Sequence, residues 1–180
     1  MELNRRNIFR IFDYRYSIYL LIAFVTLFYG CKVTYSFSGA SISPLAKTFS
    51  VQYFQNRAPL VQPGLSQALT DAIIDKCKAQ TSLKYTNSIG DVNFEGEITD
   101  YSTKPLTVAA DAQAATNRFT ITVRVKFTNA IDPNLNFEQT FSRYEDYNSN
   151  LDLSAVEKDL SDKIVEILVE DIFNQAFVNW

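Results

Sequence analysis

Strict alternation of apolar and polar residues makes residues 117–128 the clearest predicted strand of this chain. Alternation over this length is typical of a strand with one face buried and the other exposed. One side carries aromatic and branched aliphatic residues, and the other side carries three cations. The apolar positions are Phe119, Ile121, Val123, Val125 and Phe127, and the cations are Arg118, Arg124 and Lys126.

The same period of two residues predicts three further strands, over residues 47–56, 91–101 and 136–147. Gly96 lies inside the second of these and indicates a bulge or a close approach by another element. Residues 102–116 lack such alternation and predict a long hairpin loop, a kind of segment that is often functional or mobile.

Apolar residues at steps of three and four predict two amphipathic helices, over residues 65–80 and from Ser154 towards the C-terminus. Ser154 and Glu157 have the spacing of a capping box, in which each side chain bonds a free backbone N–H at the helix start. Cys77 lies on the apolar stripe of the first helix, so we expect it to pack in the core.

The second half of the C-terminal helix is apolar over a wider arc than its first half. Such an arc either docks deep in the core or forms a contact patch for a partner protein. The candidate partner contacts in this arc are Phe173, Phe177 and Trp180.

The predicted order of elements is strand, helix, strand, strand, strand, helix. Two amphipathic helices can bury their stripes against one face of a four-stranded sheet and leave the other face polar. We therefore expect a two-layer α+β sandwich, formed as one domain by residues 47–180.

The N-terminal region has the pattern of an export signal. Four arginines precede an apolar block from Ser17 to Tyr29, and Gly30 and Cys31 follow it. A cysteine after a small residue is typical of a lipoprotein signal, in which the thiol is acylated. We predict a signal peptide over residues 1–30 and a lipidated tether over residues 31–46. An uncleaved anchor and a core segment are alternatives, but the apolar block is shorter than the roughly 20 residues that span a bilayer.

Composition narrows the possible functions of the mature chain. The whole chain has a formal net charge of -3, with 17 basic and 20 acidic residues. The first 30 residues contain four arginines and two acids, so the remainder has 13 basic and 18 acidic residues and a net charge of -5. An acidic chain of this kind is a poor general binder of nucleic acid.

The sequence contains no histidine, which removes the commonest general base and the usual zinc ligand. A Ser-His or Cys-His nucleophile is thereby excluded, and no glycine-rich phosphate loop is present. We expect no enzymatic activity, no metal site and no cofactor apart from the covalent lipid on Cys31. A pair of carboxylates for glycan hydrolysis remains open.

The best candidate binding site is the cationic face of the strand at residues 117–128. The guanidinium group of arginine suits phosphate and carboxylate groups, because it is planar and presents pairs of parallel N–H donors. The alternative is an ordinary solvated sheet face with salt bridges to Glu138 or Glu145. The candidate anion-binding residues are Arg118, Arg124 and Lys126, with Lys104 from the long loop and Arg143 from the next strand as further members.

A series of short motifs runs through the chain. They are Gly30-Cys31, YSFSGASI at 35–42, FQN at 54–56, FEGEITDY at 94–101, NRFTITV at 117–123, DIFN at 171–174 and NW at 179–180. In this order and spacing they resemble the LptE family of lipopolysaccharide-assembly lipoproteins, over nearly the whole mature chain.

The resemblance implies two helices packed on a four-stranded sheet, and a protein without catalytic residues. It also implies a lipid anchor in the outer membrane, with the domain facing the periplasm and the lumen of a β-barrel. Proteins of this family plug the LptD barrel, help it to assemble and contact lipopolysaccharide. The alternative function is a free-standing periplasmic lipoprotein that binds or carries a small lipid-like ligand.

Overall fold

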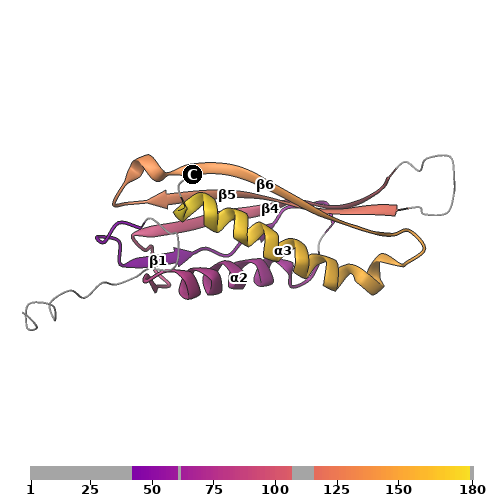
Figure 1. The fold of residues 1–180 in the computed structure, drawn as a ribbon, viewed down its shortest axis with the longest axis horizontal. Coiled ribbons are helices and arrows are strands. Elements are labelled where there is room, and N and C mark those ends of the chain that lie inside the picture. The colour runs from indigo at the N-terminus through magenta and orange to yellow at the C-terminus, as the bar shows by residue number, and fades with distance from the viewer. Residues whose placement is uncertain (1–41, 61, 107–115, 179–180) are drawn as a thin grey trace, which may run out of the picture. The chain divides into compact units, whose positions relative to one another are not determined.

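The computed structural model describes residues 42–60, 62–106 and 116–178. Within them, helices α2 (Leu65–Gln80) and α3 (Leu153–Phe177) cover one face of a mixed sheet of six strands (Figure 1). The strands are β1 (Thr48–Val51), β2 (Gln55–Asn56), β3 (Lys84–Tyr85), β4 (Val92–Pro105), β5 (Thr116–Asn129) and β6 (Phe137–Asn148), and a short 3-10 turn, η2 (Pro133–Leu135), precedes β6.

The sheet has the order β3-β1-β4-β5-β6, and β2 pairs with β4 beyond the end of β1. β4, β5 and β6 pair antiparallel, whereas β1, β2 and β3 join the sheet by parallel pairing. The predicted two-layer α+β sandwich is confirmed, and so are the bounds of α2. The expected four strands become six, because the strand expected over residues 47–56 is divided into β1 and β2, and because the two-residue strand β3 has no alternating pattern of its own.

The strand expected over residues 47–56 is divided because the chain leaves the sheet after Val51. The backbone N–H of Phe54 donates to Thr70 Oγ1 in α2 at 3.2 Å, and the Phe54 ring is fully buried. A Cβ added at Gly96 would lie only 2.4 Å from that ring, so the absence of a side chain at Gly96 makes room for it. The predicted close approach at Gly96 is confirmed, and Phe54 is the group that approaches.

The hairpin between β4 and β5 is longer than its sequence indicates. Ser102–Pro105 and Thr116 were expected in a loop, yet they continue the antiparallel ladder, with Lys104 opposite Arg118. Backbone pairing between the strands extends the ladder although Lys104 and Pro105 have low strand propensity. The rest of the expected loop, residues 107–115, lies outside the described residues.

The core lies between the inner face of the sheet and the two helices. The Phe94 and Phe127 rings are 4.9 Å apart, and the Phe177 ring of α3 packs edge-on against both at 5.9 and 5.7 Å. Phe173 is also buried and contacts Phe177. The partner-contact hypothesis is therefore wrong for Phe173 and Phe177, which are core side chains, and Trp180 lies outside the described residues.

Helix α3 begins one residue before the predicted start. Asp152 is its N-cap, and the Asp152 Oδ1 atom accepts a hydrogen bond from the backbone N–H of Ser154 at 3.2 Å. The capping-box prediction is wrong, because Glu157 instead accepts a hydrogen bond from the hydroxyl of Tyr101 on β4. Burial and the Glu157 carboxylate both raise the pKa of Tyr101, so this phenol remains a donor that ties α3 to the sheet.

A carboxylate joins the start of β1 to the start of β4. Asp91 Oδ2 accepts hydrogen bonds from the backbone N–H groups of Lys47 and Thr48 at 2.8 and 2.9 Å, and from Thr48 Oγ1 at 2.9 Å. These donors lower the pKa of Asp91, the backbone bond from Lys47 contributing most. Asp91 is thus bound more strongly as the ionised carboxylate than as the acid.

We predict that Asp91 makes the fold acid-sensitive. A depressed pKa in the folded state stabilises the protein above the unfolded pKa of about 3.9, and this contribution is lost as the pH falls through the folded value. Melting temperatures measured at closely spaced pH values should fall more steeply with acid in the native chain than in Asp91→Asn. The control Asp75→Asn, which removes an exposed carboxylate on α2, should keep the native steepness. Equal slopes for all three proteins would contradict the assignment.

Candidate anion-binding face

The outer face of the sheet is a ladder of alternating charges. The register of β4, β5 and β6 places Lys126 between Glu95 and Glu138, and it places Arg124 opposite Glu97. These side chains lie away from the helices because they alternate with the buried residues of β5. The predicted placement of the cations on one polar face is confirmed, but acidic neighbours from both adjoining strands accompany them.

Arg118 is the most strongly engaged of the three cations. Its Nε and Nη2 atoms donate to Asp146 Oδ1 and Oδ2 at 2.8 and 2.9 Å, and its guanidinium lies 3.6 Å from the centre of the Tyr144 ring. The paired hydrogen bonds raise the pKa of Arg118 and lower that of Asp146. Two of the five N–H donors and one face of the guanidinium are therefore occupied within the sheet.

Arg124 and Lys126 are held more loosely. Arg124 Nη1 lies 3.5 Å from Glu97 Oε1, and Lys126 Nζ lies 3.5 Å from Glu95 Oε2. Their side chains are 54% and 56% exposed, so water reaches most of their donors. Two residues apart on one strand, they lie about 7 Å from each other along it. This pair is the part of the face best placed to meet an external anion.

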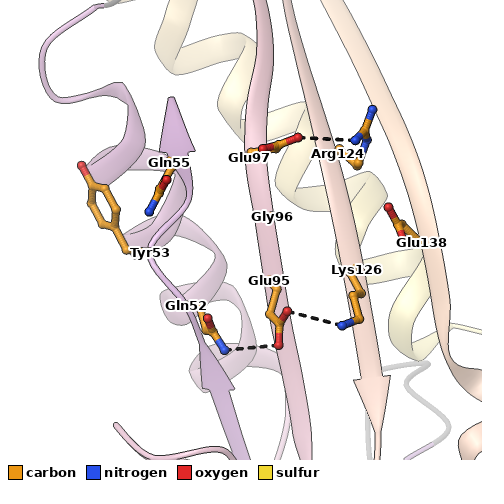
Figure 2. Close-up of a pocket in the computed structure, with 9 residues that line it drawn as sticks. All are labelled: Gln52, Tyr53, Gln55, Glu95, Gly96, Glu97, Arg124, Lys126 and Glu138. Carbon is orange, nitrogen blue, oxygen red and sulfur yellow. Dashed lines mark hydrogen bonds and ion pairs between the residues drawn. The ribbon is translucent and has the colours of Figure 1, made fainter. Parts of the chain in front are cut away.

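Figure 2 shows the hollow that surrounds this pair on the outer face of the sheet. Its volume is about 340 Å³, and Gly96 forms part of its lining. Gln52 and Tyr53 line it from the chain between β1 and β2, and Gln55 lines it from β2. The amide of Gln52 donates to Glu95 Oε1 at 3.2 Å. None of these three residues is among the candidate site residues predicted from the sequence. The polar side of the 47–56 alternation could have indicated Gln52, but Tyr53 and Gln55 do not lie on that side. Gly96 was the other available signal, and the sequence does not give its neighbours in space.

The two further candidate cations lie elsewhere. Lys104 is exposed at the opposite end of the sheet from Lys126, next to Arg118 in register. Arg143 lies on the helix side, where its Nε atom is 2.7 Å from Asp171 Oδ2 of α3. Including Arg143 in the outer face was wrong, because its position two residues after buried Phe141 turns it to the same side.

The outer face does carry salt bridges, as the alternative interpretation expected, but the acidic partners differ from those expected. The described carboxylates that pair with the face are Glu95, Glu97 and Asp146, and neither Glu138 nor Glu145 forms a described ion pair. Glu145 lies opposite Phe119 and so belongs to the inner side of β6.

The described residues contain no cluster of three or more Cys, Asp or Glu side chains that would hold a metal ion. Cys77 is buried in the core as expected, and burial raises the pKa of its thiol to about 12. In residues 42–60, 62–106 and 116–178, neither helix is long and apolar enough to cross a membrane. The predicted signal peptide, Cys31 and most of the predicted tether lie outside the described residues.

Comparison with known protein families assigns this chain to one of them. A family model described as LptE, lipopolysaccharide-assembly, matches residues 46–176, which include all the described strands and α2 and nearly all of α3. The chain belongs to the LptE family. The expected resemblance is thus confirmed, and with it membership of a family of lipopolysaccharide-assembly lipoproteins.

Solved structures share the fold of this LptE-family chain at low sequence identity. The protein XCC0632 from Xanthomonas campestris superposes with a TM-score of 0.50 at 12% identity, over 74% of this chain and 88% of that chain. A neuraminyllactose-binding hemagglutinin homolog from Helicobacter pylori gives 0.50 at 7% identity, over 79% and 89%. At these identities the likeness shows the fold alone. No curated protein sequence matches the chain.

We predict that Gly96→Ala destabilises the LptE-family fold. The new Cβ would lie 2.4 Å from the Phe54 ring and 2.5 Å from the Arg124 carbonyl oxygen, and overpacking of this kind costs about 1–3 kcal/mol. Urea unfolding would measure the loss. In the comparison variant Gly64→Ala, the added Cβ has open space and meets only the strain of a φ of 91°, about 1 kcal/mol. A Gly96→Ala protein as stable as the native chain would show that β2 and Phe54 are not packed as described.

Proposed function

We propose that this protein is an outer-membrane lipoprotein, acylated on Cys31, that plugs an LptD-type β-barrel, helps it to assemble and assists insertion of lipopolysaccharide. The observation that carries the proposal is the match of the LptE family model across residues 46–176. The Gly30-Cys31 sequence after a basic and apolar leader supports the lipid anchor. The mature domain would face the periplasm and the barrel lumen.

Lipopolysaccharide is an anionic glycolipid, and its phosphate groups suit the donors of Arg124 and Lys126. Each of these cations meets its carboxylate through one long contact of 3.5 Å, and exposed ion pairs of this kind are worth only about 0–1 kcal/mol. A phosphate that replaces Glu97 or Glu95 as the partner therefore loses little ion-pair energy, but it must pair closely with the cation because the carboxylates remain nearby and repel it. Arg118 and Lys104 form a second, more distant candidate position at the hairpin end of the sheet.

A free-standing carrier of a small lipid-like ligand is the competing function, and it requires an enclosed apolar cavity. The space where Ile73 and Cys77 of α2 meet Phe94 and α3 has no room for a water-sized molecule. The hollow on the outer face is open and polar. These features of the described residues favour assembly with a partner over storage of an apolar ligand.

We predict that Arg124→Gln/Lys126→Gln weakens binding of lipopolysaccharide by about tenfold, because two exposed charge contacts are removed and each is worth at most about 1 kcal/mol. A titration of the lipidated protein in detergent with purified lipopolysaccharide would measure the affinity. Both side chains point away from the core, so the variant should unfold at the same urea concentration as the native chain.

The matched control is Arg143→Gln/Lys158→Gln, which removes the same charge from ion-paired cations on the helix side. It should bind lipopolysaccharide as the native protein does. An equal loss in both double variants would mean that net charge, and not the outer face, governs binding. Native affinity in Arg124→Gln/Lys126→Gln would remove these two residues from the site.

We predict that a C-terminally tagged full-length chain recovers a large β-barrel protein in near-equal amount from detergent-solubilised outer membranes. Mass spectrometry of the same sample should find a diacylglyceryl and acyl modification on Cys31. In Cys31→Ser, the modification should disappear and less barrel protein should be recovered, because the anchor that keeps the two proteins in one membrane is missing. Recovery of the native chain alone would favour the free-standing carrier.

A further inference from the structure

One end of the sheet presents exposed aliphatic side chains from three separate segments. β1 and β4 are parallel and begin at this end, and β5 is antiparallel to β4 and finishes there. Leu45 precedes β1, Ile89 precedes β4 and Ile131 follows β5, and these side chains are 70%, 80% and 36% exposed. We call Leu45, Ile89 and Ile131 the apolar tip. Figure 1 shows this end of the sheet beside the label of β1.

The segment that carries Ile89 is firmly attached to the sheet. The N–H of Thr86 donates to the Phe49 carbonyl at 2.9 Å, and the N–H of Gly90 donates to Ser50 Oγ at 3.0 Å. A Cβ at Gly90 would lie 2.8 Å from the Phe49 carbonyl carbon, so the backbones are in close contact there. The exposure of Ile89 is thus imposed by a fixed backbone.

The other two segments of the tip are also fixed. The chain that leaves Leu45 is bonded to Asp91 through the N–H of Lys47, and the N–H of Ala130 donates to the Asp91 carbonyl at 2.8 Å. The N–H of Ile131 donates to Asn129 Oδ1 at 2.9 Å. Hydrogen bonds around Asp91 therefore hold three aliphatic side chains out into solvent at one end of the sheet.

The surroundings of the tip are those of a residue cluster at a lipid interface. Lys84 pairs with Thr48 at the edge of the same end, and its neighbour Tyr85 is 38% exposed, with Lys78 Nζ 5.3 Å from the centre of its ring. Tyrosine and lysine beside apolar side chains are enriched where protein meets the headgroups of a bilayer. The negative charge of Asp91 is not an unpaired charge at this end, because its carboxylate accepts hydrogen bonds from the backbone N–H groups of Lys47 and Thr48.

The tip also lies where the proposed anchor enters the domain. The described chain begins at Ile42, three residues before Leu45, and Cys31 is eleven residues before Ile42. Eleven residues span at most about 40 Å when fully extended, and about 18 Å on average when flexible. A lipid on Cys31 would therefore keep this end of the sheet close to the membrane surface.

We propose that the apolar tip enters the headgroup region of the membrane that holds the Cys31 lipid, and so sets the orientation of the domain on that membrane. The proposal rests on the lipid anchor of the proposed function. A bilayer suits the tip better than a protein partner does, because three separate side chains cover far less than the roughly 800 Å² per partner of a standard protein interface.

The test uses the lipidated protein, isolated from membranes and reconstituted in vesicles of phosphatidylethanolamine and phosphatidylglycerol without any barrel protein. In Ile89→Cys or Leu45→Cys, an environment-sensitive fluorophore is attached to the new thiol. The lipid on Cys31 blocks that thiol and Cys77 is buried, so the label goes to the chosen position. We expect a blue shift, at least a twofold rise in emission, and quenching by spin labels attached to lipid headgroups.

The matched control is Leu151→Cys, because Leu151 is 49% exposed and follows β6 at the opposite end of the sheet. Its label should keep the emission of an aqueous environment. Equal emission and quenching at positions 89, 45 and 151 would overturn the proposal. So would a label at position 89 that stays aqueous in these vesicles and becomes shielded only when barrel protein is added, because the tip would then be a protein contact.

The experiments distinguish a wrong assignment of the membrane contact from a wrong assignment of the proposed function. Loss of barrel recovery in the pull-down, with normal shielding at position 89, would leave the membrane contact intact and remove the translocon role. Absence of lipid on Cys31 in the mass spectrum would overturn both the anchor and the tip.

Discussion

The arrangement of the other strands and helices depends on the alternation of β5, which has one apolar face and one charged face. β5 lies between β4 and β6 and hydrogen-bonds with both, so its register is fixed on two sides. A slip of one residue would expose the apolar row that contains Val123 and Val125 and would bury Arg124 and Lys126 without partners. The inner row therefore packs against the two helices. The outer row can carry charge because no other part of the described chain forms a layer over it.

Those parts of the fold that follow from local periodicity were predictable, and those that depend on contacts between distant segments were not. The alternation of β5 and the apolar stripe of α2 can each be read from one continuous segment of about 15 residues. By contrast, the division of the first strand depends on Phe54 reaching Gly96, forty-two positions away. The site divides in the same way: alternation places Arg124 and Lys126 on one face, whereas their pairing with Glu97 and Glu95 depends on a register that no local pattern encodes.

The ion pairs of the outer face would make the proposed anion binding an exchange of partners. At Arg124 the partner is one carboxylate oxygen at 3.5 Å, so a phosphate has little to displace. At Arg118, a phosphate must displace the two paired hydrogen bonds to Asp146, while the guanidinium stays stacked on the Tyr144 ring. The carboxylates also repel anions that fail to pair closely. If the face binds as proposed, it would favour ligands with several closely spaced anionic groups, as a phosphorylated glycolipid has.

The proposed membrane contact and the proposed anion site lie on one strand, and their separation follows from strand geometry. Lys126 and Arg124 are three and five residues before Asn129, the last residue of β5, which puts them about 10 and 17 Å from the tip end at 3.3 Å per residue. Arg118 is eleven residues from the same end, about 36 Å away. With the tip among headgroups, the phosphates of a glycolipid at the membrane surface come within reach of Arg124 and Lys126 but not of Arg118. Under the proposed orientation, the loosely paired cations Arg124 and Lys126, and not the tightly paired Arg118, would meet the ligand.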